Sequence, residues 1–348
     1  MRLDVRKRRL AHRRGTPNLT WSTTAENAAI TSDALTVSTD DRVLWSGLIT
    51  TAVLKTRGIR MANWTSPSER ILWARTLSDD VTLEQRVSVA SKTGFGHVSF
   101  GPEEVDAYLN NSNALRSILA RAADCNVAID FLECVTEWYP HVTPKRDFLP
   151  SNYSVDEMAH ICQAFGASNI LALCAFPPVN PDEELSHYFG SLCDRMLDAG
   201  VDVHLEFTPM SPVRDLRSAW RIVGPSNRSN GRILFDTWHF FRGGLDLSAF
   251  GEVPVECIAA IQFSDAATEV IRNLINDTYH HRRLLGDGDI DFIPLLEYLT
   301  QPNGPTLIGP EIISDFTHGL EAEEAARITS SNLTAFLTSH VSMKSSRG

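Results

Sequence analysis

The sequence predicts a (β/α)8 TIM barrel, a ring of eight parallel strands surrounded by helices, with a poorly ordered N-terminal extension before it. From residue 71 onward, short apolar runs alternate with amphipathic stretches, which is the pattern of strands alternating with helices. The alternation yields eight strands, which is the number in this barrel. Several helical stretches end at a glycine directly before the next apolar run, as helices do where the chain turns back into a parallel strand.

The individual elements follow from these patterns. The predicted strands are 71–74, 97–100, 127–131, 169–173, 201–206, 233–236, 259–263 and 306–311. The clearest helical patterns are 83–92, 113–123, 155–165, 183–199, 292–299 and 322–337. Three of these helices are predicted to end at Gly94, Gly166 and Gly200.

An open, doubly wound sheet is the rival architecture. Such a sheet normally carries a glycine-rich phosphate loop after its first strand. Here residues 73–79 read Trp-Ala-Arg-Thr-Leu-Ser-Asp and contain no GxGxxG pattern. The barrel is therefore favoured.

The first 66 residues differ from the rest in composition. They are rich in Arg, Thr, Ser and Asn, and the first fourteen include seven Arg or Lys against one acidic residue. We interpret residues 1–66 as a flexible N-terminal extension, 67–340 as the catalytic barrel and 341–348 as a C-terminal tail. A DNA-binding arm and a transit peptide are the less favoured interpretations of the basic start.

Charge and cysteine content restrict the partners and the compartment. The net charge is −11 although the start is basic, so the remaining chain repels phosphate backbones and nucleic acid is a poor partner. The six cysteines lie mostly in apolar runs without a CxxC pair, which favours free thiols in a reducing cytosol and hence a cytoplasmic protein. No apolar run approaches 18 residues, so we expect no membrane partner.

Oxygen-bearing side chains stand at the ends of the last four predicted strands. Because the carboxyl ends of barrel strands form the active-site rim, these side chains should share one rim. They are Glu206, Asp236, Gln262 and Glu311. The same runs contain no Lys or Arg, and an unpaired buried carboxylate is very unfavourable. We therefore predict a bound cation, with buried salt bridges as the alternative for any single residue.

The composition of this set indicates the kind of metal. Three carboxylates and one amide oxygen form a hard, oxygen-only set, which suits one Mn²⁺ or Mg²⁺ ion. Co²⁺ and Zn²⁺ are further candidates for the same ligands.

Five motifs occur in order along the predicted strands. They are His204-Leu-Glu206, Phe235-Asp-Thr-Trp-His239, Ile261-Gln-Phe-Ser-Asp265, Arg282-Arg-Leu-Leu-Gly-Asp-Gly-Asp289 and Gly309-Pro-Glu-Ile-Ile-Ser314. Through them, residues 71–338 resemble the xylose isomerase-like TIM barrel superfamily of sugar isomerases, epimerases and dehydratases. Each motif alone has little specificity, but five in the same order form a fairly specific set.

The resemblance implies a role for each rim residue. Glu206, Asp236, Gln262 and Glu311 correspond to the family's metal ligands, and the two glutamates also correspond to the acid/base pair of its sugar epimerases. Many family members have His where this chain has Gln262, and the change makes the predicted site harder and less suited to zinc. A second departure is Leu285, which stands where a proline is common.

Further residues are predicted to contact the substrate. The resemblance implies that His239 does so, with a hydrogen-bonded core histidine as the alternative. It also implies a substrate-binding arginine in the Arg282-Arg283 pair, where we favour Arg282. The position of Trp138 near a strand end makes it a candidate wall for a sugar ring, although core packing is the simpler interpretation. His204 precedes Glu206 by two residues, so it should lie on the same face and one layer deeper.

The predicted activity is that of a metal-dependent isomerase or epimerase. Metal bound to a carbonyl and its neighbouring hydroxyl would acidify the adjacent C–H, and one glutamate would remove the proton to give a metal-bound enediolate. The other glutamate would return a proton from the opposite face. No glycine-rich phosphate cradle follows the last two strands, so the predicted substrate is a non-phosphorylated sugar or polyol-derived ketone.

Three other functions remain open. The first is a lyase or dehydratase that uses the same site on an inosose-like, dehydroshikimate-like or oxidised-glycoside substrate. The second, an apurinic endonuclease, requires a histidine-rich trinuclear zinc site that this rim does not provide. The third is a non-catalytic partner subunit. The resemblance also leaves the oligomeric state open, with a homo-oligomer among the alternatives.

Overall fold

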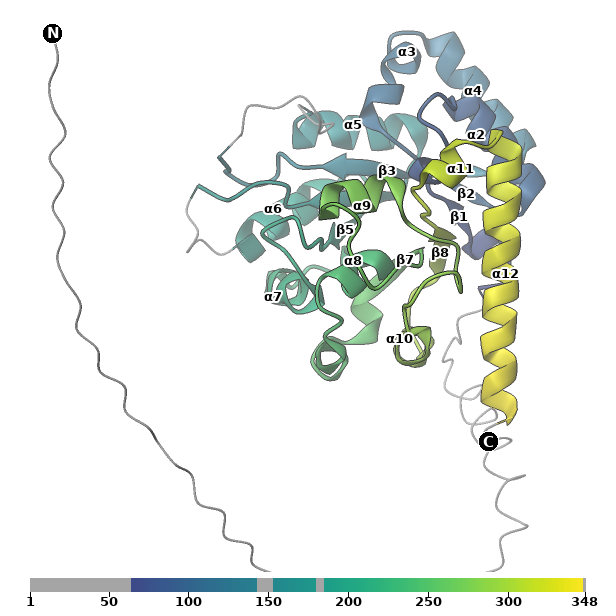
Figure 1. The fold of residues 1–348 in the computed structure, drawn as a ribbon. Coiled ribbons are helices and arrows are strands. Elements are labelled where there is room, and N and C mark those ends of the chain that lie inside the picture. Colours follow the sequence, from purple (N-terminus) through teal and green to yellow (C-terminus); the bar gives the residue numbers. More distant parts are fainter. Residues whose placement is uncertain (1–63, 143–152, 180–184, 347–348) are drawn as a thin grey trace, which may run out of the picture. The chain divides into compact units, whose positions relative to one another are not determined.

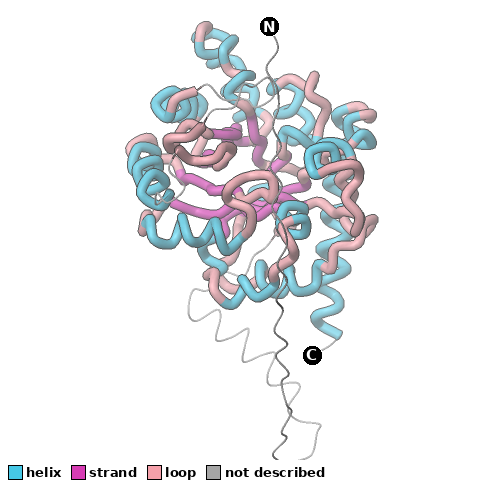
Figure 2. Tube along the Cα trace, turned by 60° about the vertical axis from the view of Figure 1, so that its left-hand side comes forward, coloured by secondary structure: helices cyan, strands magenta, loops and turns pink. Residues whose placement is uncertain are grey.

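The eight strands form one parallel sheet in the order β1-β2-β3-β4-β5-β6-β7-β8. The computed structural model describes residues 64–142, 153–179 and 185–346 (Figure 1). Arg70, immediately before β1, pairs in parallel with Ile308 of β8, so the last strand returns to the first and the barrel is nearly closed. Figure 2 shows the strands at the centre with helices around them. The predicted (β/α)8 barrel is confirmed.

The elements alternate along the chain. The strands are β1 (Ile71–Leu72), β2 (His97–Phe100), β3 (Ala128–Val135), β4 (Asn169–Leu173), β5 (Asp202–Glu206), β6 (Gly231–Asp236), β7 (Ile258–Phe263) and β8 (Leu307–Pro310). The longer helices are α2 (Leu83–Thr93), α4 (Ser112–Asp124), α5 (Val155–Phe165), α6 (Leu185–Leu197), α7 (Leu216–Ser226), α10 (Phe292–Leu299) and α12 (Ala322–Ser346). Shorter helices lie in the connections: η1 (Pro67–Glu69), η2 (Ala74–Thr76), η3 (Pro102–Glu104), α3 (Asp106–Leu109), α8 (Thr237–Arg242), η4 (Leu247–Gly251), η5 (Val255–Cys257), α9 (Leu274–His280) and α11 (Asp315–His318).

Local sequence explains where the helices begin and end. Helix α2 begins at a capping box in which Thr82 and Gln85 bind each other's backbone amides, and α5 begins in the same way at Ser154. Two of the three predicted glycine stops, Gly94 and Gly166, are confirmed, whereas α6 ends at Leu197, three residues before Gly200. Gly94 and Gly166 have φ of 88° and 71°, a left-handed conformation that glycine adopts without a steric penalty.

Two strands differ by two residues or more from their predicted carboxyl ends. Strand β1 ends at Leu72, because the chain then turns into η2, where the amide of Ala74 donates to the Ser99 hydroxyl (2.7 Å). Strand β3 continues four residues past its predicted end at Phe131, as far as Val135. Both differences lie on the half of the barrel for which no site residues were predicted from strand ends.

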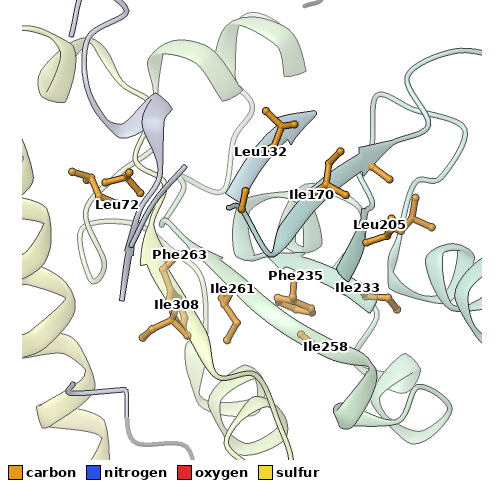
Figure 3. Close-up of a cluster of buried hydrophobic side chains, with 14 of the residues drawn as sticks. Leu72, Leu132, Ile170, Leu205, Ile233, Phe235, Ile258, Ile261, Phe263 and Ile308 are labelled. Carbon is orange, nitrogen blue, oxygen red and sulfur yellow. The ribbon is translucent and has the colours of Figure 1, made fainter. Parts of the chain in front are cut away.

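Alternation along the strands separates the helix-facing core from the barrel interior. Leu205, Phe235 and Ile261 are fully buried and belong to the large core between sheet and helices (Figure 3). Each such side chain stabilises the fold by about 1.5–3 kcal/mol. Because neighbouring residues in a strand point to opposite faces, the residue after each of these three points into the barrel.

A separate apolar cluster fills the middle of the barrel. Its buried members are Ile71, Trp73, Phe131, Cys134, Leu171, Leu234 and Ala260. Such a layer of side chains makes the barrel a packed core rather than a pore. It also divides the polar groups at the carboxyl ends of the strands from those at the amino ends.

The ends of the barrel domain can be compared with the predicted boundaries. Trp64 already packs in the core and donates its indole N–H to the Pro305 carbonyl (2.9 Å), whereas the rest of the predicted extension lies outside the described residues. Helix α12 continues to Ser346 and so includes most of the predicted tail. The six cysteines are free thiols. Among the described helices, none combines the length and apolar character needed to cross a membrane.

Candidate active site and metal centre

Four consecutive strands deliver the predicted ligands to one rim. Glu206 is the last residue of β5 and Asp236 the last of β6, while Gln262 lies in β7 and Glu311 directly follows β8. Asp236 is in register with Gln262, and Gln262 with Gly309, so these positions lie at neighbouring levels of the barrel. All four side chains are buried. The structure therefore brings together the whole set that was chosen from strand ends.

Arg282 joins two of the carboxylates. One guanidinium nitrogen donates to Asp236 Oδ2 (2.7 Å) and to Glu311 Oε2 (2.9 Å). The remaining N–H groups reach the hydroxyl of Thr278, and the guanidinium lies 5.2 Å from the centre of the Trp238 ring. The predicted substrate-binding arginine is thus buried in the rim and fixed against it.

One arginine does not balance three buried carboxylates. Burial and the charge of Asp236 hold the pKa of Glu206 well above its ordinary value. Burial also raises the pKa of Glu311 strongly, although Arg282 opposes the effect. Burial would raise the pKa of Asp236 too, but the charge and hydrogen bonds of Arg282 lower it overall. The rim therefore holds one firmly ionised carboxylate and two that bind protons more readily than ordinary glutamates.

His239 lies next to this group in the first turn of α8. Its backbone amide donates to Asp236 Oδ1 (2.8 Å), so Asp236 also caps the helix. Burial lowers the pKa of the His239 imidazole to about 4, so the ring is neutral at physiological pH. Its Nε2 lies 3.6 Å from Glu206 Oε1, too far for a hydrogen bond, and its Nδ1 has no partner among the residues that the structure describes.

The rim residues fit a divalent cation. Gln262 donates through its amide nitrogen to Glu311 Oε1 (2.9 Å), which leaves Gln262 Oε1 buried and without a hydrogen-bond partner within the described part of the chain. A buried acceptor without a donor and a surplus of carboxylates both favour a positive ligand. The ligand atoms of Glu206, Asp236 and His239 lie within 4.8 Å of one another, so the histidine is a further candidate ligand beside the predicted four.

The rim forms one wall of a cavity of about 390 Å³. Glu206, His239, Gln262, Arg282 and Glu311 all line it. A cavity of this size suits a small molecule. The cavity and the polar rim together define a candidate active site.

Two of the other predicted positions lie apart from the cavity. Trp138 is buried in the helix-facing core, where it packs against Tyr139 and donates to the Leu173 carbonyl, and it is not among the residues that line the cavity. His204 lies below Glu206 and contacts the Phe131 ring, one layer deeper as its spacing predicts.

The loop that carries Arg282 is held by Asp265. The carboxylate of Asp265 accepts hydrogen bonds from four backbone amides, including those of Gly286 and Gly288. Leu285 donates its amide to Asn332 (2.9 Å), a bond that a proline at this position could not form. The departure from the family pattern is therefore accommodated by a specific contact.

The cavity also contains residues that the sequence reasoning missed. They include Arg75 in η2, Glu133 in β3, Tyr279 in α9, and Glu103 and Glu104 in η3. Glu133 stands in an apolar run near a strand end, as Glu206 does, and would have been found had β3 been predicted at its full length. Nothing in the pattern around Arg75 or Tyr279 indicates a site.

Fold and site define a parallel (β/α)8 barrel whose carboxyl-end rim carries clustered carboxylates. The chain belongs to the xylose isomerase-like TIM barrel family, whose model matches residues 87–332. A search of curated proteins finds no match.

Solved structures share the fold at low sequence identity. The IOLI protein with a bound zinc atom is 18% identical, with a TM-score of 0.64, covering 78% of this chain and 99% of that one. A D-psicose 3-epimerase from Clostridium cellulolyticum H10 is 11% identical (TM-score 0.57, 78% and 98% covered). The probable 3-DHS dehydratase AsbF from Bacillus anthracis is 15% identical (TM-score 0.58, 76% and 98% covered).

Proposed function

We propose that this chain is a divalent-metal-dependent isomerase or epimerase acting on a non-phosphorylated sugar or polyol-derived ketone. One observation carries the proposal: Glu206 and Glu311 line the same cavity from strands separated by β6 and β7. Two buried carboxyl groups on different sides of one cavity can exchange protons with two faces of a bound molecule. Family membership and the likeness to an epimerase support this choice.

Glu206, Asp236, Gln262 and Glu311 would hold the metal ion. When bound, it would supply Lewis-acid polarisation of a substrate carbonyl and its neighbouring hydroxyl. The oxygen-rich set favours Mn²⁺ or Mg²⁺, while the zinc in the IOLI structure keeps Zn²⁺ as a candidate. Arg282 holds Asp236 and Glu311 at one point of the rim and faces the cavity.

The two glutamates would carry the protons. One removes a proton from the carbon beside the carbonyl, and the other returns a proton to the opposite face or to the neighbouring carbon. The first outcome is an epimer and the second an aldose–ketose isomer. Such proton transfer contributes roughly 10²–10⁴-fold to the rate.

Solvent hydrogen exchange tests the proposal. The full chain, saturated with Mn²⁺, is incubated in D₂O with a panel of ketohexoses, ketopentoses, inososes and their carboxylate counterparts, the uronic and ketoaldonic acids, and deuterium at the carbon beside the carbonyl is measured by NMR. We expect exchange and interconversion with at least one compound, loss of both on chelation with EDTA, and recovery with Mn²⁺ or Mg²⁺. Exchange that persists unchanged after complete chelation contradicts the metal requirement. Exchange absent from the entire panel contradicts the isomerase proposal.

A dehydratase is the second candidate, and Glu133 favours it. Elimination of water needs an acid for the departing hydroxyl as well as a base for the proton. Glu133 lines the same cavity, its Oε1 is buried with no partner among the described residues, and burial raises its pKa. The likeness to a probable 3-DHS dehydratase is a second reason to test it. In the experiment above, a product lighter by one water molecule, in place of an epimer, assigns this reaction.

A further inference from the structure

Arg75 lies in the candidate active site but is not explained by the reaction. It is the middle residue of η2, directly after β1, and it lines the same cavity as Glu206 and Glu311. The backbone around it is fixed on both sides. The Arg75 carbonyl accepts from His318 Nε2 (2.9 Å), and the Thr76 hydroxyl donates to the Pro310 carbonyl (2.6 Å). The side chain therefore projects from a rigid base.

The guanidinium of Arg75 has no acceptor of its own among the residues that the structure describes, because it donates no hydrogen bond and forms no ion pair with them. It lies over the Tyr279 ring, whose centre is 5.3 Å from the guanidinium carbon. Other cavity arginines differ: Arg282 bonds two carboxylates, and Arg86, beside the cavity, pairs with Glu104 at 3.1 Å. The guanidinium of Arg75 thus lies over an aromatic ring in the cavity, and its planar set of N–H donors has no acceptor among the described residues.

The nearby carboxylates do not take the place of a ligand. Glu133, Glu311 and Asp79 lie close enough to act on the charge of Arg75, and Arg75 acts in turn on Glu206 and Glu103. Among the described residues, none of these carboxylates accepts a hydrogen bond from Arg75. Glu311 already accepts from Arg282 and from Gln262. Burial raises the pKa of Glu133 in spite of Arg75, so that carboxyl is a weak counter-ion.

We propose that Arg75, stacked on Tyr279, binds a carboxylate of the substrate, which makes the substrate a polyhydroxy acid rather than a neutral sugar. The proposal rests on the proposed function and names its substrate class. A guanidinium fork matches the two oxygens of a planar carboxylate in charge and geometry. Phosphate shares this chemistry, but a dianion normally requires more than one unpaired cation or a backbone cradle. Because β1 adjoins β8, a carboxylate at Arg75 places one end of the substrate on the Glu311 side of the rim.

Binding to matched ligands tests the subsite without any turnover. Gluconate and glucitol have the same carbon chain, but gluconate ends in a carboxylate where glucitol ends in a hydroxymethyl group. Glucitol 6-phosphate is the corresponding ligand with a phosphate. Calorimetry on the full chain, with Mn²⁺ and again with EDTA, gives the affinity ratio for each pair. We expect gluconate to bind about tenfold or more tightly than glucitol, as a charge-assisted pair of hydrogen bonds contributes. The preference should persist in EDTA.

Variants assign the preference to Arg75. Arg75→Gln should abolish the ratio and leave glucitol binding unchanged, Arg75→Lys should retain part of it, and the exposed Arg121→Gln on α4 should retain all of it. Equal affinity for gluconate and glucitol in the parent protein overturns the proposal. Loss of binding of both gluconate and glucitol in Arg75→Gln also overturns it. A preference for gluconate that requires Mn²⁺ and persists in Arg75→Gln overturns it as well. An Arg75-dependent preference for the phosphate over gluconate overturns the assignment to a carboxylate.

The same measurements separate this proposal from the proposed function. Glu206→Gln should lose hydrogen exchange but keep the Arg75-dependent preference for gluconate. If no compound exchanges hydrogen while that preference is present, the reaction is wrong and the carboxylate subsite stands. If exchange occurs on neutral ketoses and Arg75→Gln does not alter any binding ratio, the reaction stands and the subsite is wrong.

Discussion

At the amino ends of the barrel strands, histidine and carboxylate side chains are hydrogen-bonded to one another. Asp130 accepts from the His97 ring (3.1 Å), from the Asn169 side-chain amide (3.0 Å) and from the backbone of Ser168 (2.9 Å). Because the Asn169 nitrogen donates to Asp130, its oxygen is the acceptor for His204 Nε2 (2.8 Å). Burial lowers the pKa of His204 to about 3, so its ring is neutral.

At the carboxyl ends, similar residue types are matched less completely. Gln262 Oε1 and His239 Nδ1 are buried and have no partner in residues 64–142, 153–179 and 185–346, and three carboxylates share the charge of Arg282. The layer that contains Trp73 and Phe131 separates the two ends. The comparison teaches that histidines and acids do not by themselves make a site. At the amino end Asp130 is matched by its donors, and within this network only His204 Nδ1 lacks a partner among the described residues. At the carboxyl end a surplus of carboxylates and an unmatched amide oxygen leave capacity for a ligand.

The largest expected effect is the loss of activity on changing a carboxyl-end glutamate. Glu206→Gln and Glu311→Gln should each lower the rate of exchange and turnover by roughly 10²–10⁴-fold, because the proton carrier is removed. Each variant removes a buried charge from an acidic cluster. We therefore expect each variant to keep most of the parent's free energy of unfolding, measured by urea titration. Near-normal turnover in either variant would contradict the assignment of Glu206 and Glu311 as the acid/base pair.

An amino-end change should have the opposite signature. Asp130→Ala leaves three donors without their acceptor, so we expect a loss of about 2–4 kcal/mol in the free energy of unfolding. The turnover of the folded fraction should stay within a few-fold of the parent. Urea titration followed by fluorescence gives the stability, and activity is normalised to folded protein. If Asp130→Ala lost turnover without being destabilised, the amino end would contribute to activity rather than to stability, which contradicts the comparison.

The sequence predicted the carboxyl-end set well for a physical reason. Strand alternation and the barrel rule together fix which residue of each apolar run reaches the rim, so Glu206 and Asp236 could be placed without coordinates. Arg75 could not, because it follows an irregular turn whose direction depends on contacts with β2 and α11. Trp138 illustrates the same limit: closeness to a strand end does not decide whether an aromatic ring faces a cavity or the core.

The choice of metal should depend on Gln262. Bound Mn²⁺ at 100 times its dissociation constant should stabilise the chain by about 2.7 kcal/mol, which thermal denaturation with and without EDTA measures. Gln262→His replaces an oxygen ligand by an imidazole, and we expect the ratio of Zn²⁺ to Mn²⁺ affinity to rise by about tenfold. The exposed Gln301→His controls for an added surface histidine. An unchanged ratio in Gln262→His would remove Gln262 from the ligand set.

The smallest expected effect is the pH dependence of the amino-end pair. Burial by itself lowers the pKa of His97, but the hydrogen bond and charge of Asp130 raise it overall, and the pKa of Asp130 is lowered in return. The raised histidine pKa stabilises the fold below the unfolded value of about 6.5, and this contribution is lost as the pH rises through the folded value. The lowered aspartate pKa stabilises the fold above about 4, and that contribution is lost as the pH falls.

His97→Gln should therefore lose the most stability near pH 5, by roughly 1 kcal/mol or less, and the difference from the parent should shrink by pH 8–9. Urea titrations of both proteins at several pH values measure it. His280 and Asp315, a more exposed pair at the carboxyl end (2.8 Å), provide the matched control. Because solvent screens exposed pairs, His280→Gln should show a flat difference across the same range. A flat profile for His97→Gln as well would show that the amino-end network is held by hydrogen bonds alone, without a net contribution from charge.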